Sequence, residues 1–320
     1  MCPATGSKSN VTVSFSGHET FPFRYGWLKK GIDAVTQDPT IFSSEQAMTE
    51  MGVGKNMVRS IRHWCLAAGL IREDSGANAV RGQLIATILG KKLFADNGFD
   101  PYLEDPATLW LIHWQLASNF NAATTWFWAF NYWNAAEFTK EVFVSELGTW
   151  LANSTYKQVA ENSLKRDADC FVRTYVQSRH TRGPISEDTL DCPLVDLHLV
   201  AELADGKTYQ FQRGAQPSLP DEIFIYSLIE FWRALGQTGN TLAFEKIAYE
   251  AGSPGRIFKL DEDSISDRLE RIETISDGLY AYDETAGLKQ IYKRSDAEIE
   301  PIALLKAYYR KSKAVKIRAA

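Results

Sequence analysis

The sequence predicts a mainly α protein with winged-helix units at both ends of a helical middle region. The N-terminal unit is a winged helix-turn-helix, the middle region adds a small β-hairpin, and the C-terminal unit is winged-helix-like. A glycine-broken pair of short helices, a long aromatic helical stretch and a second copy of the opening layout support this fold class. We expect domains over residues 11–104, 105–235 and 236–320, and a disordered, small and polar segment over residues 1–10.

The predicted helix-turn-helix begins with Ser43 and Gln46, which have the spacing of a capping box. A short helix follows over 45–51 and ends where two glycines supply turn geometry. A second helix is predicted over 55–68, and Gly69 stands where a left-handed C-cap belongs.

When the second helix is drawn at about 100° per residue, its apolar and polar side chains fall on opposite faces. Its apolar arc faces a core, and its polar arc carries three permanent positive charges in a chain of net charge -5. Lysine and arginine neutralise phosphates, whereas arginine and asparagine pair with base edges, so we predict contact with duplex DNA. The alternative is a packing scaffold with a solvated face. The residues of the polar arc are Lys55, Asn56, Arg59, Ser60, Arg62 and His63.

The wing of this unit follows directly. Residues 70–72 read as a short strand, 74–78 as a turn, and Val80 begins the return leg. Arg81 therefore lies on or near the wing and is a further candidate for DNA contact.

The segment before the helix-turn-helix is unusual. Residues 11–15 alternate like a short strand, and Pro22 favours a helix start, with the first helix expected over 24–35. His18 and Glu19 have the chemistry of an acid-base pair or of metal ligands. The simpler alternative, which the residues alone favour, is that Glu19 caps the helix with its neighbour Thr20 while His18 satisfies a backbone group.

Two runs carry a family resemblance: FSGHETFPFRYGWLKKG at 15–31 and MGVGKNMVRSIRHWCLAAGLI at 51–71. They resemble a bacterial family of unknown function that includes the DNA-nicking component of the single-strand DNA phosphorothioation defence system. The resemblance implies a protein that acts on double-stranded DNA with a cysteine desulfurase, an ATP-using sulfur-transfer enzyme and an ATPase, which together replace a non-bridging phosphate oxygen by sulfur. His18, Glu19 and Arg24 match the first run and are the candidate catalytic positions.

Two functions from different classes follow. One is a DNA nickase that depends on a divalent metal ion, Mg²⁺ or Mn²⁺. The other is a non-catalytic, DNA-bound adaptor or transcription-regulator-like protein that recruits the sulfur-transfer enzymes. Metal-dependent strand scission separates them.

Composition sets the outer limits. The chain of 320 residues is 45% hydrophobic and 23% charged, as in ordinary globular proteins. Its four cysteines form no Cys-x-x-Cys pair, which favours a reducing, cytoplasmic setting without disulfides or zinc. We expect no signal peptide and no membrane-spanning segment.

The middle region is rich in aromatic residues between 107 and 151, with almost no Lys or Arg before Lys140. A buried core is favoured over a platform that stacks on unpaired bases, because such a platform also needs positive charge. A further helix is expected over 155–178, with a solvated surface around Asp167. Asp205 and Lys207 superficially match the carboxylate-lysine pattern of metal-dependent nucleases, but Asp-Gly between alternating segments favours a β-hairpin.

The C-terminal unit repeats the layout with different chemistry. A helix at 242–250, a turn at 252–255, a helix at 263–275 and a hairpin over 279–292 form the winged-helix-like arrangement. Its second helix is acidic and would repel phosphates, so a scaffold or partner-binding role is favoured. The basic tail from Lys306 to Arg318 leaves DNA contact open.

Overall fold

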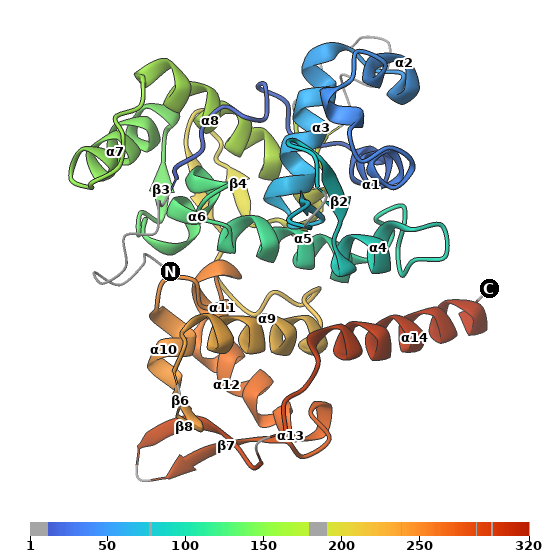
Figure 1. Ribbon diagram of the computed structural model, residues 1–320. Helices are drawn as coiled ribbons and strands as arrows, with labels where there is room; N and C mark the ends of the chain where they lie inside the picture. The colour runs from blue at the N-terminus through green and yellow to red at the C-terminus, as the bar shows by residue number, and fades with distance from the viewer. Residues whose placement is uncertain are drawn as a thin grey trace. The chain divides into compact units, whose positions relative to one another are not determined.

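The computed structural model confirms a mainly α protein with three small antiparallel sheets among its described residues (Figure 1). No helix in that part of the chain is long and apolar enough to cross a membrane. The predicted disorder of residues 1–10 lies outside the described residues. The structure describes residues 12–76, 79–178, 191–237, 239–285, 287–295 and 297–319, without the side chains of 315–319.

The chain divides into two compact units. One unit comprises the described residues from Thr12 to Ala129 together with Trp133–Gln212. The other comprises Phe130–Tyr132 and the residues from Arg213 onward. The helix that ends at Ala234 packs against C-terminal helices of the same unit. The domain bounds expected from the sequence stay a prediction.

The first unit opens with helices and a two-stranded hairpin in the expected order. The helix α3 matches its predicted span to within one residue, and Gly52 and Gly69 take the left-handed conformation. The hairpin strands pair antiparallel, with Arg72 opposite Ile85. The elements are α1 (Trp27–Gln37), a 3₁₀ turn (Ile41–Ser43), α2 (Ala47–Met51), α3 (Lys55–Ala67), β1 (Ile71–Glu73), β2 (Leu84–Ala86) and α4 (Ile88–Phe94).

Three local expectations need correction. The helix α1 begins at Trp27 rather than Arg24, because the preceding residues form an irregular loop held by side chains. The helix α2 begins at Ala47, since Ser43 belongs to the 3₁₀ turn and makes no side-chain cap. Residues 12–15 form no strand; the Ser14 amide donates instead to Thr124 Oγ1 at 2.9 Å.

The rest of the first unit has an aromatic core. Trp110, Trp126, Phe127 and Trp128 are each at most 3% exposed, so the predicted core is confirmed and the stacking platform is not formed there. A small sheet of order β3-β5-β4 lies beside the helices. The elements are α5 (Pro106–Ser118), α6 (Thr124–Asn131), β3 (Glu137–Phe138), α7 (Lys140–Ala152), α8 (Glu161–Tyr175), a 3₁₀ turn (Pro193–Leu197), β4 (Val200–Glu202) and β5 (Tyr209–Phe211).

The hairpin between β4 and β5 confirms the turn that Asp205-Gly206 predicted. Gly206 has φ 67°, and the Asp205 carboxylate accepts hydrogen bonds from the Lys207 and Thr208 amides. Bonds from Thr208 and Lys207 lower the pKa of Asp205 to about 2. The carboxylate therefore stabilises the turn, and no further carboxylate joins it in a metal-binding group among the described residues.

The second unit packs α9 against α14 and a three-stranded sheet of order β6-β8-β7. The helix expected over 263–275 is interrupted near Arg271, which binds the Asp221 carboxylate beside Arg268. The elements are α9 (Asp221–Ala234), β6 (Thr241–Ala243), α10 (Phe244–Tyr249), α11 (Pro254–Ile257), α12 (Glu262–Glu270), α13 (Ile272–Ile275), β7 (Tyr280–Thr285), β8 (Leu288–Lys293) and α14 (Pro301–Ala319).

Candidate functional site

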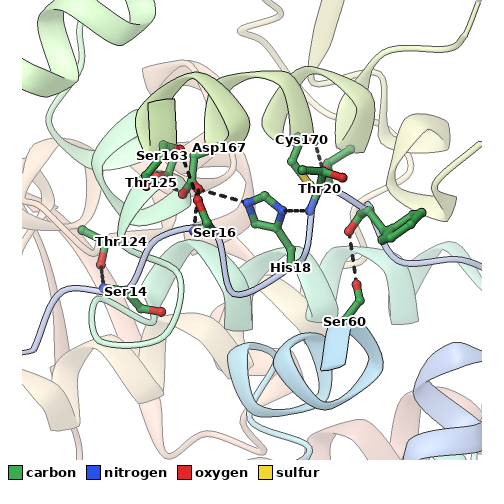
Figure 2. A network of polar contacts seen from close by, with 12 residues as sticks. Ser14, Ser16, His18, Thr20, Ser60, Thr124, Thr125, Ser163, Asp167 and Cys170 are labelled. Atoms are coloured by element: carbon green, nitrogen blue, oxygen red, sulfur yellow. Dashed lines mark hydrogen bonds and ion pairs between the residues drawn. The ribbon is translucent and has the colours of Figure 1, made fainter. Parts of the chain in front are cut away.

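The N-terminal segment of the first unit is tied to α8 by one buried carboxylate, Asp167. Its Oδ1 accepts the Ser16 amide at 2.7 Å and lies 3.1 Å from His18 Nε2 (Figure 2). Its Oδ2 accepts the Thr125 hydroxyl at 2.6 Å. Asp167 is 1% exposed, so these donors replace the water that a buried carboxylate would otherwise need.

His18 is held from both sides of its ring. Nε2 faces Asp167, while Nδ1 accepts a hydrogen bond from the Thr20 amide at 3.1 Å. An acceptor at Nδ1 and a donor at Nε2 require the neutral ring with its proton on Nε2. His18 is 1% exposed and therefore positions the loop around it, as the simpler sequence interpretation expected of a histidine that satisfies a backbone group. A catalytic role for His18 stays a prediction, and both of its nitrogens are already occupied.

The backbone around His18 is constrained. Ser16, Glu19 and Thr20 have positive φ angles of 58°, 49° and 68°, each costing about 1 kcal/mol or more for a residue with a Cβ. A Cβ on Gly17 would lie 2.5 Å from His63 Nδ1, so the close approach to α3 needs glycine. We call residues 16–24 the clamped loop, because buried hydrogen bonds hold this strained segment in one conformation.

The clamped loop also bonds directly to α3. The Phe21 carbonyl accepts from Trp64 Nε1 at 2.9 Å and from Ser60 Oγ at 3.4 Å. On the outside, Arg59 Nη1 lies 3.3 Å from Glu19 Oε1. The structure thus brings together a candidate catalytic residue, Glu19, and a candidate DNA contact, Arg59.

The predicted DNA-binding arc of α3 is only partly exposed. Lys55, Asn56 and Arg59 are exposed, and Arg62 is half-buried. Ser60 is fully buried, contrary to its predicted position on the solvent face, because its hydroxyl serves the Phe21 carbonyl. Arg81 is exposed in the loop between β1 and β2.

His63, also placed on that arc, is half-buried beside the clamped loop. Its ring centroid lies 5.8 Å from that of His18, and its Nε2 is shielded from solvent without a hydrogen-bond partner among the described residues. Burial first, and the neighbouring His18 next, lower the pKa of His63 to about 3. His63 is therefore neutral at physiological pH and adds no charge to the arc.

Arg24 lies at the end of the clamped loop and is 6% exposed. Its guanidinium carbon stands 5.6 Å from the Phe21 ring centroid and 5.1 Å from that of Trp27. From α8, Arg173 donates to the Thr20 carbonyl. Arg24 and Arg173 both line a cavity of about 320 Å³ that also reaches Met57 of α3. We call this cavity the arginine pocket.

Sequence reasoning missed Asp167, Thr125 and Arg173. Asp167 was assigned to a solvated surface because charged residues surround it in the sequence. The available signal was helical spacing: Leu164, Asp167 and Phe171 fall on one buried stripe of α8. No local pattern singles out Thr125 or Arg173, since Thr125 bonds to Asp167 42 residues away and Arg173 bonds to the Thr20 carbonyl 153 residues away.

We expect Asp167→Ala to lower the free energy of unfolding by about 3–5 kcal/mol, because it leaves the buried donors of Ser16, His18 and Thr125 without an acceptor. Urea unfolding followed by circular dichroism measures the loss. The control is Asp169→Ala on the same helix, where an exposed ion pair with Lys140 is worth less than about 1 kcal/mol. Equal losses in the two variants would contradict the clamping role.

The low pKa of His63 predicts a pH-dependent stability. Between about pH 6.5 and 3 the unfolded chain takes up a proton at His63 that the folded chain does not, so the free energy of unfolding falls as pH falls. We expect His63→Asn to remove up to about 1.4 kcal/mol per pH unit of that slope. The exposed His198→Asn is the control, and a slope unchanged in His63→Asn would refute this burial effect.

Comparison with known proteins places this geometry in a family. A family model described as "Protein of unknown function (DUF4007)" matches residues 15–309. An SspB crystal structure is 30% identical, with a TM-score of 0.83, over 93% of this chain and 88% of that chain. A magnesium ion-bound SspB crystal structure is 31% identical, with a TM-score of 0.82 and the same coverage.

The comparison with curated proteins returns no match. The predicted resemblance to a family of unknown function that includes SspB is confirmed. The chain belongs to the family described as protein of unknown function, DUF4007.

Proposed function

We propose that this protein is the DNA-binding component of a bacterial DNA phosphorothioation system and introduces single-strand nicks for sulfur incorporation. The observation that carries the proposal is the exposed basic part of α3, Lys55 to Arg59, beside the clamped loop that bears Glu19 and Arg24. The family resemblance supplies the system, including its cysteine desulfurase, ATP-using sulfur-transfer enzyme and ATPase as partners. A cytoplasmic location goes with this proposal.

We infer that α1 to α4 with β1 and β2 are a winged helix. Two helices joined by the turn at Gly52, followed by an antiparallel hairpin, follow the order of that fold. In this arrangement α3 is the recognition helix and Arg81 belongs to the wing. Lys55, Asn56 and Arg59 then meet phosphates and base edges of double-stranded DNA.

The ion pair between Arg59 and Glu19 fits DNA binding. The two side chains are 55% and 33% exposed, and a pair at such a surface is worth less than about 1 kcal/mol. A DNA phosphate can therefore replace Glu19 as the partner of Arg59. This exchange frees the Glu19 carboxylate when DNA arrives.

Hydrolytic nicking gives Glu19 and the arginines distinct roles. A water oxygen attacks phosphorus, the bond to the leaving sugar oxygen breaks, and the water proton passes to a base. Glu19 is the candidate base, and Arg24 is the candidate for stabilising the negative charge on the oxygens of the pentacoordinate transition state. His18 acts as a positioning residue, because Asp167 and the Thr20 amide engage its ring.

One structural neighbour contains magnesium, which agrees with the metal dependence expected for a nickase. Within the described residues, however, no three His, Cys, Asp or Glu side chains converge on a common point. Because the side chains present do not form such a site, we assign no step to a metal ion. The engagement of Glu19 with Arg59 favours the alternative function, a non-catalytic adaptor.

Charge reversal on α3 tests DNA binding. We expect Arg59→Glu with Arg62→Glu to weaken binding to duplex DNA at least tenfold and to reduce the salt-dependence slope by about 2, one unit for each lost phosphate contact. Fluorescence anisotropy over a salt series measures both. Lys165→Glu with Arg166→Glu on α8 is the control of equal charge change. Equal loss in both double variants would indicate bulk charge rather than an interface on α3.

Relaxation of supercoiled plasmid tests nicking, with Mg²⁺ or Mn²⁺ compared against a chelator. We expect Glu19→Gln to lose at least 100-fold in nicking rate while DNA binding is kept or tightened, since Arg59 loses its competing carboxylate. The control is Asp205→Ala with Lys207→Ala, which alters only a hairpin turn. If the wild type binds DNA without nicking it, the adaptor function is the better account.

A further inference from the structure

The arginine pocket is a cavity to which the proposed function assigns a role for Arg24 alone. It lies between the clamped loop, α3 and α8, and its charged lining consists of Arg24, Arg173 and Asp191. Met57 places it one residue away from Asn56, on the helix proposed to contact DNA. A DNA strand bound at Asn56 would therefore lie one residue along the chain from the pocket lining.

The charges of the pocket suit a singly charged anion. Among the described lining residues, two arginines and one aspartate carry charge, which gives a net charge of about +1. Asp191 accepts the Ser178 amide at 3.0 Å, which holds its carboxylate in place. A phosphodiester-type group carries one negative charge, whereas a terminal phosphate carries nearly two and would be repelled more strongly by Asp191. The pocket thus fits an internal backbone position of a nucleic-acid strand.

Apart from Ser178, the remaining lining of the arginine pocket is apolar. Phe21, Met57 and Cys192 line it beside the arginines. Burial raises the pKa of the Cys192 thiol, so the sulfur is neutral and does not repel an anion. Phe21, Met57 and Cys192 offer a strongly hydrated phosphate oxygen only the weak S–H donor of the thiol. They offer dispersion contacts to a large, polarisable and weakly hydrated atom such as sulfur.

Arg24 has the rigidity that discrimination requires. Its guanidinium lies against the rings of both Phe21 and Trp27, so a shift toward a misplaced ligand would weaken both cation–π contacts. The clamped loop fixes Phe21 through Trp64. The distance between the arginines and the apolar side chains of the pocket is therefore fixed. A fixed distance is needed to recognise an anion that has an oxygen on one side and a sulfur on the other.

We propose that the arginine pocket binds a phosphorothioate diester of DNA, with its oxygen toward Arg24 and Arg173 and its sulfur against Met57 and Cys192. This inference rests on the proposed function and names the group that the DNA-binding face distinguishes. The protein then distinguishes a strand that already carries sulfur from one that does not. It binds modified strands more tightly than unmodified ones.

The test compares short duplexes and single strands that are identical except for one central phosphorothioate, with the Rp and Sp forms measured separately by anisotropy competition. We expect one diastereomer to bind about three- to tenfold more tightly than the phosphate, the ratio that burial of one methylene-sized apolar atom gives. Met57→Gln and Cys192→Ser should bring this ratio, measured within each variant, toward one. Met48→Gln, an exposed methionine on α2, is the control and should keep the ratio.

The possible results distinguish failure of the phosphorothioate proposal from failure of the proposed DNA-binding function. A wild-type ratio of one, with DNA binding intact, overturns the inference alone. A ratio that survives in both Met57→Gln and Cys192→Ser overturns it as well, because sulfur would then be recognised elsewhere. If the wild type binds neither strand, the DNA-binding proposal itself fails.

Discussion

The structure of the candidate site depends on the buried carboxylate of Asp167. It accepts hydrogen bonds from a backbone amide, a histidine and a threonine that come from two distant parts of the chain. These donors offset the cost of burying the carboxylate. The hydrogen bonds to the carboxylate in turn stabilise the loop at 16–24 in a conformation with three positive φ angles. One interaction thus sets the conformation of a whole functional segment.

The consequence is a rigid loop laid along α3. Its inner side bonds to Ser60 and Trp64, and its outer side presents Glu19 to Arg59 and Arg24 to the arginine pocket. The polar residues of α3 therefore have two different roles, structural and binding, that the sequence alone does not distinguish. Some hold the loop from within, and others remain available to a partner. DNA recognition and strand chemistry, as we propose them, use the residues that remain available.

Local signals predicted local structure well. The ends of α3 and the Asp205-Gly206 turn follow from glycine geometry and short-range hydrogen bonds, which the sequence contains in full. The start of α1 and the burial of Ser60 could not be predicted, because both depend on the Phe21 carbonyl meeting α3. The burial of Asp167 could be predicted only from its helical spacing with other buried residues of α8. The pocket residues come from three segments far apart in the chain, and no sequence pattern joins them.

The central claim is that the exposed end of α3, beside the clamped loop, is the surface that meets DNA. Site-specific photo-cross-linking tests it directly, with a cross-linking amino acid at Asn56 and, for comparison, at Glu270 on the acidic α12. The account predicts a covalent adduct with labelled duplex DNA at position 56 and little or none at position 270. Adducts at position 270 with none at position 56 would contradict it.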